Sequence, residues 1–421
     1  MSALHVKTKR HQAKKEYSRS MSMSEKKHIA IGLRKFFEQH YDLRYNVMKQ
    51  TEEFRRKPTC QNMKATYGAK EPPYEAREPF QWKQLTDREL KRIAFEQMEM
   101  VGVAWAIDVE LFVRSGIVRN FNPIADYLDK CPRWDGNDHI GLLAHRVDCD
   151  FMEWEAWFHR WFLAMVAQWQ QRSRDYGNSV VPMLIGRQGT HKSTFCKLIL
   201  PPSLREYYID DIKLDSAEQV ERMISRMLLV NIDEYNAKTD REQAKIKRIL
   251  TERDVQTRKM RSDQYVMLPR MASFIATTNE REPLNDATGS RRYICCEVLG
   301  VIDTDTPVNH PQLYAQAVAE LNQGATWYFS KQEESAIERH NSQYQQQSAP
   351  EQIILAYYEP APRQKENFIR AIDMQKELQK HIRPSEIPSL KVLTMALKRG
   401  HFPYGCRNGY HGWYAKQLKR E

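Results

Sequence analysis

The chain has 421 residues, more than one ordinary hydrophobic core requires, and this length predicts several domains. A hydrophobic content of 41% with 28% charged residues excludes a disordered or fibrous protein, and no run approaches the roughly 18 apolar residues of a membrane-spanning helix. The formal charge of +11 favours a polyanionic partner, nucleic acid above all.

The N-terminus, MSALHVKTKRHQAKKEYSR, is strongly basic and predicts a flexible arm over residues 1–20. It has no apolar segment followed by a small-residue cleavage site, so it does not resemble a secretory signal. The seven cysteines form no C-x-x-C pair, which indicates reduced thiols. Together these features predict a cytoplasmic protein without a membrane partner.

The next segments predict a helical N-terminal region, which we assign as an α+β domain over residues 21–119. An amphipathic helix and a strand are expected in EKKHIAIGLRKFFEQHYDLRYNV, followed by a loop rich in proline and charge. Helical periodicity then returns, with Thr86 or Asp87 as N-cap. A helical domain over residues 120–175 follows, whose four tryptophans recur at the spacing of a packed helix face.

Between residues 176 and 300, apolar strands alternate with helices in the pattern of an α/β core. The strand VVPMLI leads into GRQGTHKST, which is almost the phosphate-binding loop G-x-x-x-x-G-K-[ST]. Backbone N–H groups of such a loop bind phosphates, while its lysine and hydroxyl serve phosphate and magnesium. His191 replaces the last glycine and could strain the loop or donate to the phosphates. The predicted ATP-binding residues are Gly186, Gly189, Thr190, His191, Lys192, Ser193 and Thr194.

Three later segments supply groups that phosphoryl transfer needs. One apolar strand ends at Asp233 and Glu234, a second ends at Asn279, and Arg291 and Arg292 precede a third. Each signal alone has an ordinary explanation in an exposed turn or a salt-bridged surface. Strand carboxyl ends share one edge of an open α/β sheet, where ligands bind, and we expect one site built from the loop and all three segments, the arginines included.

These motifs, GRQGTHKST, LLVNIDE, PRMASFIATTN and GSRRY, closely resemble the virulence-associated protein E family. Its members are P-loop ATPases of phages, plasmids and genomic islands, related to superfamily 3 helicases and phage primase-helicases. The segment FNPIADYLDKCPRWDG resembles the family's N-P…Y-L…W-D-G pattern, and the resemblance covers about residues 120 to 330. It implies an AAA+-like core, ATP and Mg²⁺ as cofactors, a homo-oligomeric hexameric ring, and DNA as substrate.

The resemblance also implies individual roles at matching positions. Lys192 and Ser193 would contact phosphate and magnesium, Asp233 would hold the metal, Glu234 would be the base, Asn279 would sense the γ-phosphate, and Arg291 or Arg292 would be a finger offered to the adjacent subunit. No acidic-triad strand pattern of a primase is visible in the first hundred residues, so priming would come from a separate protein.

Two segments are predicted to contact DNA. In superfamily 3 helicases a hairpin before the asparagine strand projects into the ring channel, and RDVQTRKMRSDQYVMLPR occupies that position. Its cations can follow phosphates while an aromatic ring stacks on a base, which suits a single strand. The alternatives are an exposed loop without a ligand and a contact between subunits. The predicted contacts are Arg258, Lys259, Arg261 and Tyr265.

The C-terminal region is the second candidate for a DNA contact. A helical extension is expected over residues 301–340, a linker over 341–350 and a separate domain over 351–421. In the last domain, an amphipathic helix and a β-hairpin turning at Asn408 and Gly409 suggest a small winged-helix-like α+β module. Its predicted DNA contacts are Lys398, Arg399 and Arg407; the alternative is a lid whose aromatic residues pack its own core.

Three functions remain open at the level of sequence. The first is an ATP-hydrolysing, DNA-translocating motor that replicates a phage, plasmid or genomic island. The second is a nucleotide-gated oligomer in antiphage defence or replication interference, without unwinding. The third is a non-catalytic DNA-binding scaffold, against which the pair Asp233 and Glu234 argues, because a pure binding switch needs no hydrolytic carboxylate.

Overall fold

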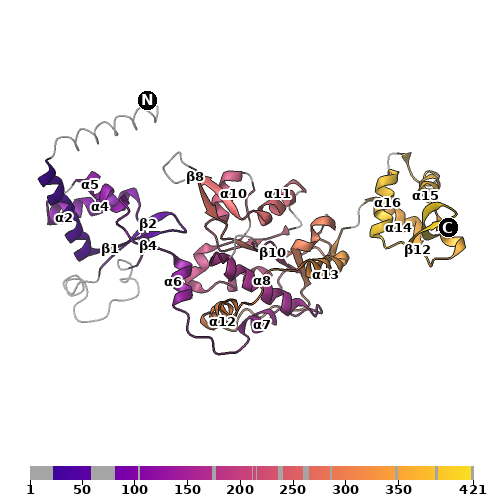
Figure 1. Ribbon diagram of the computed structural model, residues 1–421, viewed down its shortest axis with the longest axis horizontal. Helices are drawn as coiled ribbons and strands as arrows, with labels where there is room; N and C mark the ends of the chain where they lie inside the picture. Colours follow the sequence, from indigo (N-terminus) through magenta and orange to yellow (C-terminus); the bar gives the residue numbers. More distant parts are fainter. Residues whose placement is uncertain are drawn as a thin grey trace, which may run out of the picture.

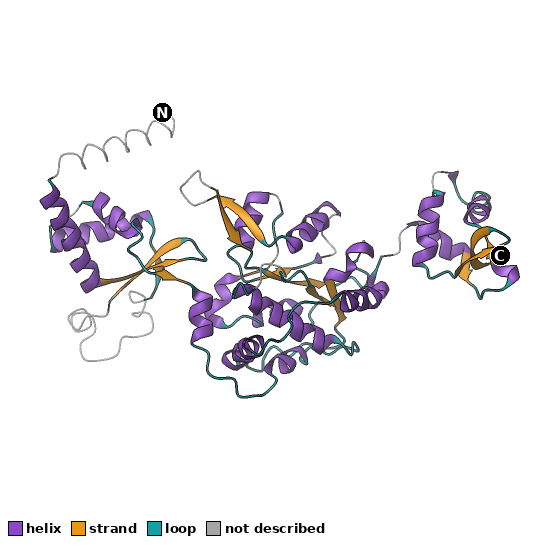
Figure 2. Cartoon of the chain, viewed as in Figure 1, coloured by secondary structure: helices purple, strands orange, loops and turns teal. Residues whose placement is uncertain are grey.

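A computed structural model describes residues 22–57, 81–102, 105–172, 177–210, 212–214, 216–235, 240–258, 265–284, 287–346, 349–384 and 387–418. The predicted basic arm lies outside these residues, as does most of the loop predicted after the first strand. Three units follow one another along the longest axis of the molecule (Figure 1). Each unit combines a sheet with helices packed alongside it (Figure 2).

The N-terminal unit is a four-stranded sheet of order β3-β2-β1-β4 with helices against it. Ser22 and Glu25 form a capping box at the start of the first helix, and Thr86 is the N-cap of the second, as predicted. Aromatic and aliphatic side chains such as Phe36 and Ile93 are buried between them. The elements are α2 (Met23–His40), β1 (Tyr41–Asn46), β2 (Thr51–Arg56), β3 (Lys83–Gln84), α4 (Asp87–Met100), α5 (Ala106–Arg114) and β4 (Asn120–Phe121).

The middle unit, the core, is built on a five-stranded sheet whose neighbouring strands are all parallel. Its order is β11-β5-β10-β7-β6, and the three central strands are buried along their whole length. Burial on both faces explains why these strands are mostly apolar and lack the alternation of polar and apolar residues of a half-exposed strand. The strands are β5 (Val181–Ile185), β6 (Tyr208–Asp210), β7 (Leu229–Ile232), β10 (Ser273–Thr278) and β11 (Tyr293–Glu297).

The sheet separates two apolar clusters, because side chains of a strand alternate between its faces. Leu184 and Ile275 face the larger cluster, which holds all four predicted packing tryptophans of α8, whereas Met183 and Phe274 face the smaller one. Helices α8 and α12 lie on one side of the sheet, and α10 and α11 on the other (Figure 1). The helices are α6 (Pro123–Asp129), α7 (His139–Ala144), α8 (Trp154–Trp169), α9 (Lys192–Leu198), α10 (Ala217–Ile224), α11 (Asp240–Thr251), α12 (His310–Asn322) and α13 (Lys331–Asn341).

A hairpin interrupts the core between α11 and β10. Its strands β8 (Asp254–Arg258) and β9 (Tyr265–Pro269) pair antiparallel and form a separate two-stranded sheet beside α10. Arg270 follows β9 directly, and its backbone N–H donates to the carbonyl of Arg253 at 2.8 Å, which closes the base of the hairpin. This is the hairpin that the resemblance implies before the asparagine strand.

The C-terminal unit has its own apolar cluster, in which Leu393, Leu397 and Trp413 are buried. Its last two strands form the predicted hairpin, and both turn residues have positive φ, +49° at Asn408 and +77° at Gly409. The elements are α14 (Ala349–Tyr357), β12 (Tyr358–Pro360), β13 (Phe368–Ile369), α15 (Ala371–Leu378), α16 (Leu390–Arg399), β14 (Tyr404–Arg407) and β15 (Tyr410–Gln417). Part of the predicted linker, Ser342–Tyr344, is a 3-10 helix whose tyrosine is buried.

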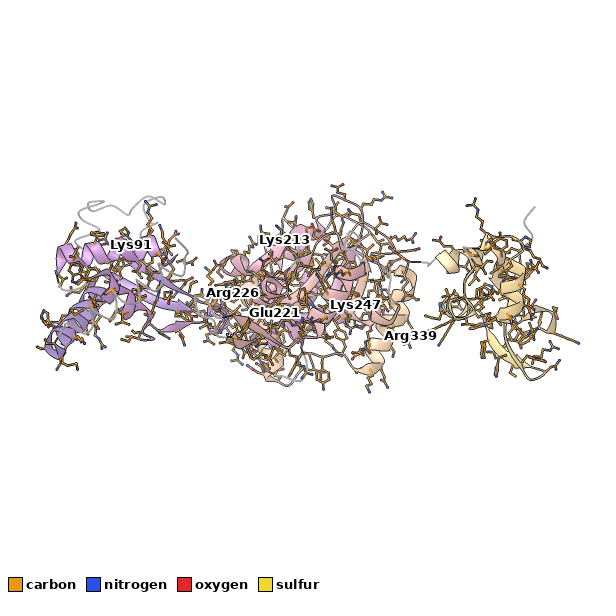
Figure 3. All side chains as sticks on the ribbon, turned by 90° about the horizontal axis from the view of Figure 1, so that it is seen from above. Lys91, Lys213, Glu221, Arg226, Lys247 and Arg339 are labelled. Atoms are coloured by element: carbon orange, nitrogen blue, oxygen red, sulfur yellow. The ribbon has the colours of Figure 1, made fainter. Side chains whose placement is uncertain are left out.

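The turn between β1 and β2 contacts the core. Arg226, at the junction in Figure 3, donates to Oε1 of Gln50 at 2.9 Å, and Nζ of Lys49 lies 2.7 Å from a carboxylate oxygen of Glu206. The side chain of Met48 enters the larger apolar cluster of the core.

Within the described residues, no helix combines the length and apolarity that crossing a bilayer requires.

A buried asparagine organises this turn. Oδ1 of Asn46 accepts from the backbone N–H groups of Met48 and Lys49, at 3.1 and 3.0 Å. Its Nδ2 donates to Glu53 and to the hydroxyl of Tyr207 in the core, both at 3.0 Å. Asn46, Glu53 and Tyr207 are each at most 3% exposed, so these polar groups depend on one another rather than on water.

We expect the substitution Asn46→Ala to lower the free energy of unfolding by about 1–3 kcal/mol, because buried polar partners would lose their hydrogen bonds. Urea denaturation followed by tryptophan fluorescence measures this change. Asn137→Ala removes an exposed amide and serves as the control. Equal midpoints for the two variants would contradict a stabilising role for Asn46.

Candidate nucleotide-binding site

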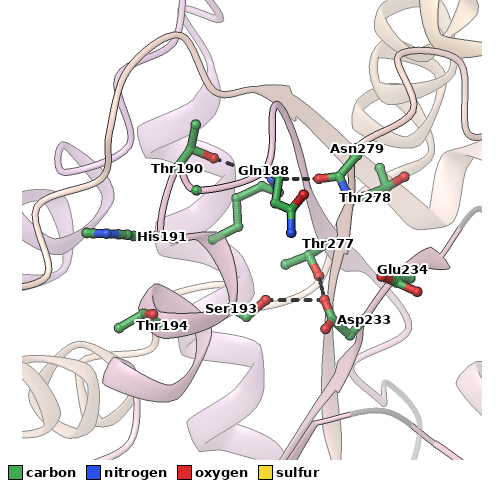
Figure 4. Close-up of a pocket in the computed structure, with 12 residues that line it drawn as sticks. Gln188, Thr190, His191, Ser193, Thr194, Asp233, Glu234, Thr277, Thr278 and Asn279 are labelled. Carbon is green, nitrogen blue, oxygen red and sulfur yellow. Dashed lines mark hydrogen bonds between the residues drawn. The ribbon is translucent and has the colours of Figure 1, made fainter.

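The sheet order brings the predicted residues to one edge. β10 lies between β5 and β7 and is parallel to both, so the three strands end on the same side. The loop that follows β5 therefore faces Asp233, which follows β7, and Asn279, which follows β10 (Figure 4). Backbone bonds hold this arrangement, since the N–H of Gly186 donates to the carbonyl of Thr278 at 3.1 Å.

The loop lysine points back into its own loop. Nζ of Lys192 donates to the carbonyls of Gly186 and Arg187 at 2.7 and 2.8 Å, and to Oδ1 of Asn279 at 3.1 Å. The hydroxyl of Thr190 is 3.4 Å away. Only 7% of Lys192 is exposed, and this burial lowers the pKa of its ammonium group, while the charge of Asp233 acts in the opposite direction.

A carboxylate with two hydroxyl donors lies beside the lysine. Ser193 Oγ donates to Oδ1 of Asp233 at 3.2 Å, and the hydroxyl of Thr277 donates to the same oxygen (Figure 4). The second carboxylate oxygen accepts neither bond. Asp233 is thus fixed in orientation by α9 on one side and β10 on the other.

These groups line a cavity of about 300 Å³. It contains the predicted loop residues except Gly186, together with Asp233, Glu234 and Asn279. Three further residues, Gln188, Thr277 and Thr278, were not predicted. The threonines are read from sequence as ordinary strand residues, although their position one and two places before Asn279 at a strand end was an available signal. The lining residues are Gln188, Gly189, Thr190, His191, Lys192, Ser193, Thr194, Asp233, Glu234, Thr277, Thr278 and Asn279.

The replacement of glycine by His191 falls on a left-handed backbone position. His191 has φ +63° and ψ +22° and immediately precedes α9, so the loop keeps the conformation for which glycine is best suited. Histidine is among the residues that tolerate this region, at a cost of order 1 kcal/mol. Its Nδ1 lies 3.3 Å from the hydroxyl of Thr304, which holds the ring on the outer side of the loop. The predicted strain therefore resides in the backbone.

Glu234 has the same kind of backbone. Its φ is +47°, and its side chain is exposed at the mouth of the cavity. Non-glycine residues with positive φ concentrate at functional sites, where the surrounding structure holds them. The positive φ ends the extended backbone that β7 leads into, and Glu234 lines the cavity next to the hydrogen-bonded Asp233.

Arg291 and Arg292, the predicted finger residues, do not line this cavity. They precede β11, and Tyr293 at the start of β11 pairs with Val181 at the start of β5. The loop begins at Gly186, five residues after Val181, which is about 17 Å away at the 3.3 Å rise per residue of a strand. Arg291 is bound to Glu334 at 3.2 Å, and neither arginine lines the cavity of its own chain.

The predicted DNA contacts are distributed over two units. Lys259 and Arg261 lie outside the described residues, and Arg258 ends β8 with an undescribed side chain. Tyr265, which pairs with Arg258 across the hairpin, is 60% exposed. In the C-terminal unit, Lys398 is exposed, Arg407 is half-buried beside the hairpin turn and Arg399 ends α16.

We expect His191→Val to lower the free energy of unfolding by about 1–3 kcal/mol, because a β-branched residue is strained at positive φ. His191→Gly, which suits this backbone, should leave stability close to that of the wild type. Thermal unfolding followed by circular dichroism measures both. Equal melting temperatures for the two variants would show that the left-handed conformation does not persist in solution.

Comparisons with known proteins show which structures and which family this chain is similar to. A search of curated proteins gave no significant match. Among solved structures, the apo structure of the NrS-1 C-terminal region (305–718) aligns with 92% of this chain and 99% of its own at 13% identity, with a TM-score of 0.45. The A form of the apo NrS-1 C-terminal region aligns with 89% of this chain and 87% of its own, at 14% identity and the same score.

A family model gives the assignment. The model described as the virulence-associated protein E-like domain matches residues 128–346, more than half of the chain. The matched segment contains the loop from Gly186 to Thr194, Asp233, Glu234 and Asn279, which are the positions that carry the resemblance in the sequence. The match confirms that resemblance, and the protein belongs to the virulence-associated protein E-like family.

Proposed function

We propose that this chain is an AAA+-like P-loop ATPase that uses ATP hydrolysis to translocate on DNA during replication of a phage, plasmid or genomic island. The observation that carries the proposal is the hydrogen bonding between separately predicted residues. Lys192 bonds to Asn279 at 3.1 Å, and Ser193 bonds to Asp233 at 3.2 Å. Residues up to 87 positions apart in sequence thus meet in one cavity of suitable chemistry.

The roles in hydrolysis follow from these contacts. The Nζ of Lys192 is already inside the loop, so it can exchange its carbonyl contacts for phosphate oxygens. Asn279 is positioned beside it to sense the terminal phosphate. Glu234 is exposed and lines the cavity together with Asp233, and a carboxylate there can orient the attacking water.

The site also fits Mg²⁺. Asp233 and Ser193 supply a carboxylate and a hydroxyl oxygen, the hard ligands that Mg²⁺ prefers, and Mg²⁺ is commonly held by one or two carboxylates and the substrate phosphates. Bound there, the ion would neutralise charge on the phosphates. Among the described residues, no three His, Cys, Asp or Glu side chains form a separate metal cluster.

DNA is proposed to contact the β8–β9 hairpin. Tyr265 and Met267 are 60% and 63% exposed on this hairpin, and the sequence of the same segment is basic at positions 258, 259 and 261. Exposed aromatic and basic residues together suit a single strand. The winged-helix-like C-terminal unit is a second proposed contact, through Lys398, Arg399 and Arg407.

We further propose a hexameric ring in which Arg291 or Arg292 serves a neighbouring cavity, with priming left to a separate protein.

We expect wild-type protein to hydrolyse ATP faster when single-stranded DNA is present, because the hairpin and Asn279 are consecutive parts of the chain. Steady-state release of phosphate from ATP, with and without oligodeoxythymidylate, measures this. Glu234→Gln should bind ATP without turnover, and Lys192→Ala should not bind it. Turnover indifferent to DNA would instead favour a nucleotide-gated assembly, and binding without turnover in the wild type would favour a scaffold.

We expect simultaneous change of Arg258, Lys259 and Arg261 to Ala to weaken DNA binding and flatten its dependence on salt. Each lost phosphate contact should reduce the slope of log K against log salt by about 0.7 for a single strand. Fluorescence anisotropy at several salt concentrations measures the slope. Changing the exposed basic residues of α4, Arg88 and Lys91, is the control, and an unaltered slope in the triple variant would place the DNA elsewhere.

A further inference from the structure

Arg270 is a buried cation at the base of the hairpin. It is 2% exposed and stands between β9, which ends the hairpin, and β10, which leads to Asn279. Within the described residues its guanidinium forms no ion pair. Burial lowers its pKa to about 10, with Glu252 acting in the opposite direction, so the group remains charged at neutral pH.

Oxygen atoms from three separate segments hold this charge. Nη1 donates to the carbonyls of Ile249 and Leu250 in the last turn of α11, both at 3.2 Å. Nη2 donates to the carbonyl of Asn178 at 2.9 Å and to Oε1 of Gln168 at 3.1 Å. The carbonyls at a helix C-terminus carry partial negative charge, which favours a cation there.

Two of these partners are joined in turn to β5 and β10. Gln168 Nε2 donates to the carbonyls of Met271 and Ala272, which precede β10, at 3.2 and 2.7 Å. Asn178 precedes β5, and its Nδ2 donates to Oγ of Ser273, the first residue of β10, at 3.0 Å. Arg270 thus connects the hairpin base to the starting ends of both strands.

The opposite ends of the same two strands carry the nucleotide site. β5 ends in the phosphate loop, and β10 ends at Asn279, which bonds to Lys192. A short buried strand behaves as a rigid element, so a displacement at its start reaches its end. Chains of packed and hydrogen-bonded groups of this kind can carry coupling between distant sites.

We propose that Arg270 is a positioning residue that transmits DNA engagement at the hairpin to the ATP cavity. This inference rests on the proposed function, because it assigns the path between its two sites. Burial of an arginine without a carboxylate partner is costly. Its Nη1 is occupied by the end of α11, and its Nη2 by α8 and the segment before β5. Lysine cannot reproduce this geometry, because its single ammonium group does not span the planar guanidinium fork.

The test is ATP turnover by full-length Arg270→Lys, with and without oligodeoxythymidylate, together with DNA affinity and melting temperature. We expect basal turnover and DNA affinity to remain, whereas the ratio of DNA-stimulated to basal turnover should fall by about 2- to 30-fold, the range for a lost coupling of this kind, or to one. Arg339→Lys, an exposed change on α13 (Figure 3), is the matched control.

Each other outcome overturns the proposal in a distinguishable way. An unchanged ratio in folded Arg270→Lys, including equal losses of basal and stimulated turnover, would make Arg270 a structural residue only. Should that variant not fold, Gln168→Met removes one of the four acceptors and should lower the ratio by a smaller factor; an unchanged ratio there rejects the path. Wild-type turnover that ignores DNA would overturn the proposed function, and the path with it.

Discussion

A parallel sheet places the carboxyl ends of its strands along one edge, and here the middle strand of three arrives last in the chain. Because β10 is inserted between β5 and β7, Asn279 and Thr277 lie between the loop that follows β5 and Asp233. The contacts of Lys192 and Asp233 both include a residue at this strand end. Without that insertion, Lys192 would lose its hydrogen bond to Asn279, and Asp233 would lose the hydroxyl donor Thr277. The geometry of the cavity therefore depends on strand adjacency more than on any single residue.

The sequence predicts the members of this site better than their contacts. Strand ends at Asp233 and Asn279 could be recognised, since an apolar run that stops at a polar residue is a local signal. Which strands are neighbours depends on tertiary packing, so the bonds from Lys192 and from Thr277 could not be predicted. The left-handed backbone at Glu234 has no sequence signature either. The burial of Arg270 is the feature that composition predicts least well. Arg270 belongs to the basic segment that the sequence assigns to DNA binding, yet its side chain lies inside the protein.

Two buried polar junctions attach peripheral elements to the core. Asn46 joins the N-terminal unit to Tyr207, and Arg270 joins the hairpin to α8 and α11. Apolar contacts alone tolerate sliding, whereas a buried donor or acceptor that loses its partner costs about 1–3 kcal/mol. Each junction therefore fixes one orientation of its element. The two differ in chemistry: Asn46 is a neutral amide that also shapes its own turn, whereas Arg270 carries a charge held by neutral oxygens.

The separation of Arg291 from its own cavity by the length of a strand has a consequence for assembly. If an arginine at the starting edge of the sheet completes the cavity of another copy, as proposed above, two different surfaces meet and the contact is heterologous. Repetition of a heterologous contact gives either an open filament or a closed cycle. In an open filament of any length, one terminal copy always has a cavity that no arginine reaches. Under this proposal, only a closed cycle lets every copy both give and receive an arginine, so a full set of complete sites would require closure.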